Sequence, residues 1–235
     1  MAYIYVIMGD YDLALKYCKE SLSNEKVSKL TRMRVFETLV SIYYFKNELS
    51  RVLKYQEQSL VIAEEENILL IPKLRMMGRL YMNKGEYDKA IIYLKSSLAR
   101  AENWGYNWCI MDSLTGLIFT HLANDSRKGA NRYYTRLIEL HRKGLITAKD
   151  YLYTKAFMMR ISDRMRDRVE AQTMFKQIAD DISYVSEYRV YSMVNRCDLL
   201  LEELNLYNDS EILKEIDELI VSLLNIAEKE RNYKW

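Results

Sequence analysis

The chain has 235 residues, of which 49% are apolar and 29% are charged, with a single Pro and seven Gly. This is enough apolar material for a sizeable core, which excludes a disordered or a collagen-like chain. So few turn residues disfavour a strand-rich fold with many tight turns and favour a small number of long helices. The net charge of +2 excludes the strong positive field that drives non-specific binding to nucleic acids or membranes.

Helical periodicity predicts eleven helices after a short first helical segment at 2–8. In chain order, these are expected at 10–23, 27–46, 49–66, 70–84, 87–103, 106–123, 127–143, 148–163, 167–182, 185–206 and 210–231. Paired in sequence, they make about six helical hairpins.

The first half of the chain repeats with a period of 38 residues. Three segments align without gaps: YIYVIMGDYDLALKYCKESL, YYFKNELSRVLKYQEQSL and YMNKGEYDKAIIYLKSSL. A fourth, weaker copy is expected from three sets of equivalent positions: Tyr5, Tyr43, Tyr81 and Phe119; Gly9, Asn47, Gly85 and Ala123; and Ser21, Ser59, Ser97 and Thr135. Repetition at this length indicates an array of stacked units.

The third copy shows what one unit is. Its two apolar stripes have helical spacing, and between them Gly85 can take the left-handed conformation that ends a helix. The unit is therefore a helical hairpin. A single hairpin cannot bury its apolar side alone, so we expect neighbouring copies to stack into a solenoid.

These residues resemble the tetratricopeptide repeat family. The family pattern consists of small, aromatic and bulky positions at fixed spacing. In the third copy these positions are Gly78, Tyr81, Gly85, Tyr87, Ala90, Leu94, Ser97 and Leu98. The first copy has Tyr5, Gly9, Tyr11, Ala14 and Leu22, and the second has Tyr43, Leu49, Ser59 and Leu60. The resemblance covers residues 1–103 well. It implies an all-α, right-handed superhelical solenoid and a single domain over 1–235, with regular repeats at 1–125 and degenerate ones at 126–235.

Two departures from the family pattern matter. The usual unit has 34 residues and often ends with a Pro, whereas this period is 38 and Pro72 lies near the start of a first helix. HEAT and armadillo repeats, with units of about 40 to 47 residues, are the structural rivals. Long hairpins of this kind look like the sensor arms of signalling ATPases and transcription regulators, or the peptide-binding domains of quorum-sensing regulators.

The two ends of the chain suggest part of a longer array. The segment at 2–8 is half the length of its equivalents, and a further helix could begin at Tyr233-Lys234-Trp235. We therefore expect a fragment of a longer protein, or self-association through the array ends.

The binding surface is expected on the first helices, which line the concave side of a stacked array. Their outward positions include Glu37, Phe45, Met82, Ser113 and Leu117, and the predicted peptide-binding residues Arg34, Ser41, Tyr44, Arg75, Arg79, Asn83 and His121. Arg75 and Arg79 are four apart and share a helix face with Asn83. Family members clamp a peptide carboxylate with basic and Asn residues at comparable places, so an acidic or C-terminal peptide is the expected partner. The alternative is that both arginines pair with nearby acids.

No catalytic or cofactor site is expected. His121 and His141, the two histidines, lie on different expected helices without carboxylates or cysteines at ligand spacing, which disfavours a metal site. Motifs for phosphate, dinucleotide, hydrolase or metalloprotease sites do not occur in the sequence. Cys18, Cys109 and Cys197 are too dispersed for a disulfide framework, and the N-terminus lacks signal-peptide features. We expect a soluble cytoplasmic scaffold, without enzymatic activity and without a cofactor.

Nucleic-acid binding is the alternative function. Residues 127–168 carry 12 basic and 4 acidic side chains together with four tyrosines, whereas residues 169–235 carry 7 basic and 14 acidic ones. Basic and aromatic residues together suit single-stranded nucleic acid. The repeats share no regularly spaced polar pair of the kind that base-reading arrays use, which favours a peptide partner.

Overall fold

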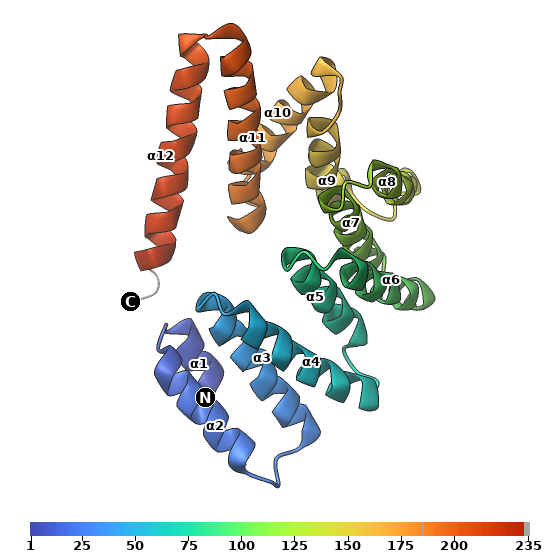
Figure 1. Cartoon of the computed structure of the whole chain (residues 1–235), viewed down its shortest axis with the longest axis vertical. Coiled ribbons are helices and arrows are strands. Elements are labelled where there is room, and N and C mark those ends of the chain that lie inside the picture. Colours follow the sequence, from blue (N-terminus) through green and yellow to red (C-terminus); the bar gives the residue numbers. More distant parts are fainter. Residues whose placement is uncertain (185, 233–235) are drawn as a thin grey trace. The chain divides into compact units, whose positions relative to one another are not determined.

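The computed structural model describes residues 1–184 and 186–232, which form twelve α helices and no strand (Figure 1). In chain order, the helices are α1 (Ala2–Ile7), α2 (Tyr11–Ser23), α3 (Lys29–Phe45), α4 (Leu49–Glu65), α5 (Leu70–Asn83), α6 (Tyr87–Trp104), α7 (Asn107–Ala123), α8 (Arg127–Arg142), α9 (Ala148–Arg160), α10 (Met165–Asp180), α11 (Ser186–Tyr207) and α12 (Ser210–Asn232). Each expected helix is present, with ends within a few residues of the prediction. The expected further helix at Tyr233-Lys234-Trp235 lies outside the described residues.

The chain divides into two compact units, Met1–Ile146 with α1 to α8 and Thr147–Trp235 with α9 to α12. The expected change from regular to degenerate repeats after residue 125 falls inside the first unit, and the expected single domain stays a prediction. Within each unit, consecutive helices pack as antiparallel hairpins (Figure 1). First helices of neighbouring hairpins also touch, α1 with α3, α5 with α7, and α9 with α11. This is the stacked-hairpin arrangement predicted from the repeats.

Four hairpin turns in the first unit have the same geometry. In each turn one residue has positive φ: Gly9 at 78°, Asn47 at 56°, Gly85 at 80° and Asp125 at 50°. The next backbone N–H in each turn donates to a carbonyl five residues earlier, as Glu86 does to Tyr81 at 2.9 Å and Ser126 to His121 at 2.8 Å. These bonds satisfy carbonyls at the helix end that would otherwise lack partners.

The fourth turn corrects one predicted equivalence. A strict period of 38 places Ala123 at the position of Gly85, but the left-handed residue is Asp125, because this copy reaches its turn two residues later. Asp tolerates the left-handed conformation through its short polar side chain. With this shift, His121 rather than Phe119 takes the position of Tyr81.

A stacked aromatic pair joins the two helices of each hairpin in the first unit. The ring centroids of Tyr5 and Tyr17, Tyr43 and Tyr55, and Tyr81 and Tyr93 lie 5.3, 5.6 and 5.5 Å apart. In the fourth hairpin the imidazole of His121 stacks on Tyr133 at 5.5 Å. Such pairs add stabilisation beyond the area they bury. Tyr81 is thus a packing residue.

Small residues allow the helices around α6 to approach closely. Leu94 of α6 is fully buried, and a Cβ added at Gly78 of α5 or Gly116 of α7 would lie within 2.8 Å of its side chain. At the same interface, the hydroxyls of Ser97 and Ser113 share a hydrogen bond of 2.9 Å. The family positions Gly78 and Leu94 therefore act as a matched small and bulky pair.

The second unit is packed differently, around aromatic side chains. Phe175 of α10 is fully buried, and the Tyr153 ring of α9 lies 6.1 Å from it and 5.3 Å from the Tyr188 ring. Burial raises the pKa of the Tyr153 hydroxyl to about 12.

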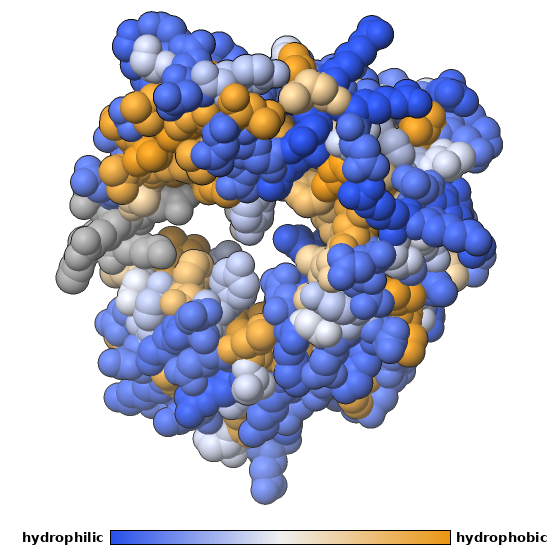
Figure 2. Space-filling view, turned by 45° about the horizontal axis from the view of Figure 1, so that its top comes forward, coloured by the Kyte–Doolittle hydropathy of each residue, from blue (hydrophilic) through white to orange (hydrophobic). Residues whose placement is uncertain are grey.

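Some hydrophobic side chains stay at the surface. Figure 2 shows a hydrophobic area over α12, where Leu213, Ile220, Val221 and Leu224 are exposed. Among the described residues, none of the helices combines the length and hydrophobicity that crossing a membrane requires.

Candidate functional site

The predicted binding residues lie in the first unit, and part of them line a groove between α3 and α5. The groove has a volume of about 280 Å³ and includes Ser41, Arg75 and Arg79 of the predicted set, together with Glu37. Val40, Leu69, Pro72 and Met76 supply apolar walls. The first helices of two neighbouring hairpins therefore form one surface, as the expected stacking requires.

Leu69 shapes the edge of this groove. It precedes α5 in the left-handed conformation, with φ 51° and ψ 24°, and its side chain is exposed. A non-glycine residue in this conformation costs roughly 1–2 kcal/mol. Pro72, in the first turn of α5, needs no hydrogen-bond donor there, as predicted. Both apolar side chains are consequently held at the mouth of the groove.

Two ion pairs link helices along the groove. The Lys73 ammonium, which is buried, lies 2.5 Å from a Glu37 carboxylate oxygen on α3. The Arg75 guanidinium lies 2.6 Å from Asp112 of α7, and its Cζ is 4.7 Å from the centre of the Trp108 ring. The Arg75 and Asp112 side chains are only 20% and 15% exposed, so their charges largely cancel within the protein. For Arg75, the alternative of pairing with a nearby acid is what the structure shows.

Arg79 differs from both of these cations. It is exposed on α5, lines the groove, and has no ion-pair or hydrogen-bond partner among the described residues. With Lys73 and Arg75 compensated by Glu37 and Asp112, Arg79 is the cation of the groove that stays available to a ligand. Its guanidinium offers the fork of donors that matches a carboxylate.

The other predicted residues lie apart from the groove lining. Arg34 is exposed on α3, and Asn83 is exposed at the last position of α5. Tyr44 is exposed at the end of α3, with its ring centre 6.3 Å from that of Phe45 in an edge-on arrangement. For these three residues, a role in binding stays a prediction.

His121 is placed in a hairpin contact instead of the groove lining. Its ring stacks on Tyr133, and a Cβ added at Gly129 of α8 would overlap the imidazole. The Nδ1 atom is buried without a hydrogen-bond partner in the described structure. Burial, with a contribution from the nearby Lys95, lowers the pKa of the imidazole. His121 is therefore a packed and predominantly neutral side chain at pH 7.

Several residues of this site were not predicted from the sequence. Lys73 and Asp112 are ordinary charged residues of helical segments, and only the packing of α3, α5 and α7 shows that they neutralise Glu37 and Arg75. The aromatic pairs had a usable signal, since Tyr17, Tyr55 and Tyr93 recur every 38 residues, each 12 residues after a repeat Tyr.

The cysteines provide no reactive group at the groove. All three are free, and Cys18 is fully buried, which raises the pKa of its thiol to about 11. A thiol with this pKa is almost entirely protonated at neutral pH and is a weak nucleophile. Cys18 is therefore an inert core residue.

The described helices define an all-α array of stacked antiparallel hairpins, which is the architecture of a helical-repeat solenoid protein. Comparisons identify the repeat. Residues 1–26 and 74–103 match two family models, each described as tetratricopeptide repeat. Residues 1–26 and 74–103 are thus identified as tetratricopeptide repeats, and the predicted resemblance to that family is confirmed.

Solved structures support the same fold. The chain is similar to a Podosopora anserina protein, a putative kinesin light chain whose TPR-like repeats are nearly identical to one another. The sequence identity is 14% and the TM-score is 0.55, and the match covers 81% of this chain and 96% of that chain. For a variant of that protein the identity is 14%, the covered shares are 83% and 97%, and the TM-score is 0.56. No curated protein matches the sequence. The all-α solenoid fold is thus confirmed, and the tetratricopeptide repeats at 1–26 and 74–103 support a helical-repeat scaffold for protein interactions.

Proposed function

We propose that the groove between α3 and α5 binds a protein segment that carries a carboxylate, either an acidic side chain or a C-terminus. The observation that supports this proposal is Arg79, an exposed cation without a partner among the described residues, on a groove whose other two cations are neutralised. A carboxylate paired with Arg79 gains charge-assisted hydrogen bonds, while apolar side chains next to it cover Pro72 and Met76.

The proposed role is that of a sensor or adaptor in a regulatory or signalling system. The long repeat unit resembles the sensor arms and peptide-binding domains of such systems. We place the protein in the cytoplasm, because its three cysteines are free thiols, as is usual in a reducing compartment. The scaffold acts by binding, without an enzymatic step of its own. Self-association through the array ends stays a prediction that light scattering of the purified chain can test.

The experiment measures binding of short peptides to the intact chain. A displayed peptide library is selected on the wild-type protein, and the enriched peptides are measured by fluorescence anisotropy in free-acid and amidated forms. We expect enrichment of apolar residues next to Asp, Glu or a free C-terminus. One charge-assisted hydrogen bond contributes about 1.5–3 kcal/mol, so Arg79→Ala is expected to weaken binding about tenfold to a hundredfold.

Arg100→Ala is the matched control. Arg100 is an exposed arginine of α6 that, like Arg79, has no partner in the described structure, but it does not line the groove. This variant removes the same charge and is expected to bind the peptides as the wild type does. Equal affinities for the two variants, or enrichment of basic peptides that Arg79→Ala binds normally, would contradict the proposed function.

The nucleic-acid alternative has less support in the structure. Many basic residues of 127–168 are paired with acids, Arg136 with Glu102, Lys149 with Asp181, and Arg160 with Asp198. Such pairing reduces the positive field available to a phosphate backbone. Filter binding of labelled single strands at two salt concentrations tests the alternative, which requires retention that falls as salt rises.

A further inference from the structure

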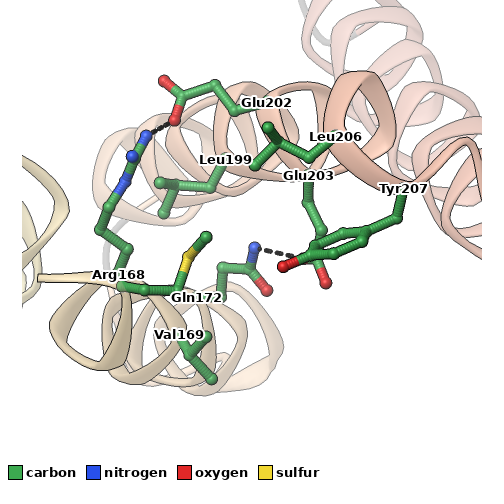
Figure 3. Close-up of a pocket in the computed structure, with 9 residues that line it drawn as sticks. Arg168, Val169, Gln172, Leu199, Glu202, Glu203, Leu206 and Tyr207 are labelled. Carbon is green, nitrogen blue, oxygen red and sulfur yellow. Dashed lines mark hydrogen bonds and ion pairs between the residues drawn. The ribbon is translucent and has the colours of Figure 1, made fainter.

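A second pocket lies in the other unit, between α10 and α11, where two helix ridges face each other (Figure 3). Met165, Val169 and Gln172 follow one another at helical spacing on α10, and Leu199, Glu203 and Leu206 do so on α11. The pocket has a volume of about 90 Å³. A cavity of about 150 Å³ holds a benzene molecule, so this pocket has room for one aliphatic side chain.

The pocket has an apolar floor and exposed apolar walls. Leu199 at its base is buried, whereas Leu206 and Tyr207 are each 64% exposed and Met165 and Val169 are about half exposed. Exposed apolar side chains gathered around a concave surface are typical of interaction sites. A partner side chain that enters the pocket removes this apolar surface from water, at about 25 cal/mol per Å².

The charges at the two ends of the pocket are not equivalent. At one end Arg168 forms an ion pair with Glu202, so these two charges cancel. At the other end Glu203 accepts a hydrogen bond of 3.0 Å from the neutral amide of Gln172 and pairs with no cation among the described residues. Figure 3 shows Glu203 beside the Tyr207 ring, with the Arg168–Glu202 pair at the opposite end. The pocket therefore keeps one uncompensated negative charge.

We propose that this pocket is a second docking site, which takes a protein segment with a Leu, Ile or Met side chain next to a Lys or Arg. The aliphatic side chain fills the space over Leu199, and the cation pairs with the Glu203 carboxylate. The exposed Tyr207 ring adds a surface that attracts cations. The pocket is separate from the groove at Arg79, and it prefers a cationic partner whereas the groove prefers a carboxylate. The two proposals can therefore be tested independently of each other.

The test uses the full chain and a displayed peptide library selected on the Arg79→Ala variant, in which the acid-binding groove is weakened. We expect enrichment of peptides with an aliphatic residue next to a basic one. Fluorescence anisotropy then compares their affinities for Glu203→Gln and for Asp217→Asn, an exposed acid on α12 without an ion-pair partner in the described structure. Glu203→Gln is expected to weaken binding at least about tenfold, and Asp217→Asn to leave it unchanged.

A second variant tests the apolar part of the pocket. Leu206→Ser changes an exposed side chain, so the helices stay packed, and it is expected to weaken the same peptides while circular dichroism stays unchanged. Enrichment of acidic peptides, or equal effects of Glu203→Gln and Asp217→Asn, would overturn the proposal. So would sedimentation showing a dimer that Glu203→Gln dissociates, because a second copy of the chain would then be the occupant.

Discussion

The two units solve the same packing problem with different residues. Around α6, the glycines Gly78 and Gly116, of which Gly78 is a position of the family pattern, let α5 and α7 approach the Leu94 side chain. Around α10, where that pattern is lost, Phe175 and the ring of Tyr153 fill the interior. Stacked hairpins thus require a well-filled interface but not one particular set of residues, which explains why the fold persists where the family pattern is lost.

The units also differ in the charge they leave available. In the groove of the first unit Arg79 is the unpaired cation, and in the pocket of the second unit Glu203 is the unpaired carboxylate among the described residues. The other charged residues that line the two sites are neutralised in ion pairs. The peptide experiments above test this difference through Arg79→Ala and Glu203→Gln. Substitutions at Phe175 and Gly78 and the titration of His121 test the difference in packing.

The largest effect is expected for Phe175→Ala. Phe175 is fully buried at the centre of the aromatic cluster, and truncating such a side chain costs about 3–5 kcal/mol of stability. Urea unfolding measures the loss, and hydrogen exchange by mass spectrometry locates it. We expect faster exchange in α9 to α11 and unchanged exchange in α5 to α7.

The control for this variant is Ile182→Ala, which removes an apolar side chain that is 84% exposed. A surface truncation of this kind is expected to change stability by no more than about 0.5 kcal/mol. A similar loss of stability in both variants would show that the cluster around Phe175 is not a packed core.

An intermediate effect is expected for Gly78→Ala. A Cβ at Gly78 would lie 2.5 Å from Leu94 Cγ and 3.2 Å from the backbone oxygen of Ala90, so the helices must move apart. Overpacking of this kind costs about 1–3 kcal/mol. Thermal unfolding followed by circular dichroism measures the loss.

Gly116→Ala sharpens this prediction. At Gly116 the three atoms nearest to an added Cβ all belong to the flexible Leu94 side chain, with Cδ2 at 2.8 Å, so we expect a smaller loss than for Gly78→Ala. If Gly78→Ala instead stabilised the protein by about 0.5–1 kcal/mol, helix propensity alone would account for it and the close approach would be refuted.

The smallest effect is expected for the pH dependence due to His121. Burial lowers its pKa in the folded chain, so below pH of about 6.5 the unfolded chain binds the proton more strongly. The contribution of neutral His121 to the free energy of unfolding is fully present above that pH. It is lost as the pH falls toward the pKa of His121 in the folded chain. His121→Phe keeps a ring against Tyr133 and is expected to remove this part of the acid destabilisation.

The measurement is the difference in melting temperature between pH 7.5 and 5.5 for the wild type and for His121→Phe. The carboxylates contribute equally to the pH dependence of the melting temperature in both proteins, so their contribution cancels in the difference. His141→Phe is a control, since that histidine lies on α8 outside the stacked pair and its Nδ1 is 3.2 Å from the Ile146 carbonyl oxygen. Equal pH dependence of the wild type and His121→Phe would contradict the prediction.

The helices and their turns could be predicted from the sequence, because they depend on local patterns. Periodic apolar residues, the positive-φ glycines Gly9 and Gly85, and the spacing of Tyr5, Tyr43 and Tyr81 all act within one hairpin. The shift of the fourth turn to Asp125 was missed, because several polar residues there tolerate the same backbone conformation.

The binding surface was decided by tertiary structure. Arg75 and Arg79 are indistinguishable in the sequence, one helical turn apart on the same face. Only the packing of α5 against α7 brings Asp112 to Arg75 and leaves Arg79 available, and only the packing of α10 against α11 leaves Glu203 without a cation among the described residues. Helix formation depends on interactions between residues three and four apart in the chain, and a sequence shows this spacing directly. Ion pairs between hairpins join side chains about 37 residues apart, and a single sequence does not show which of these side chains meet.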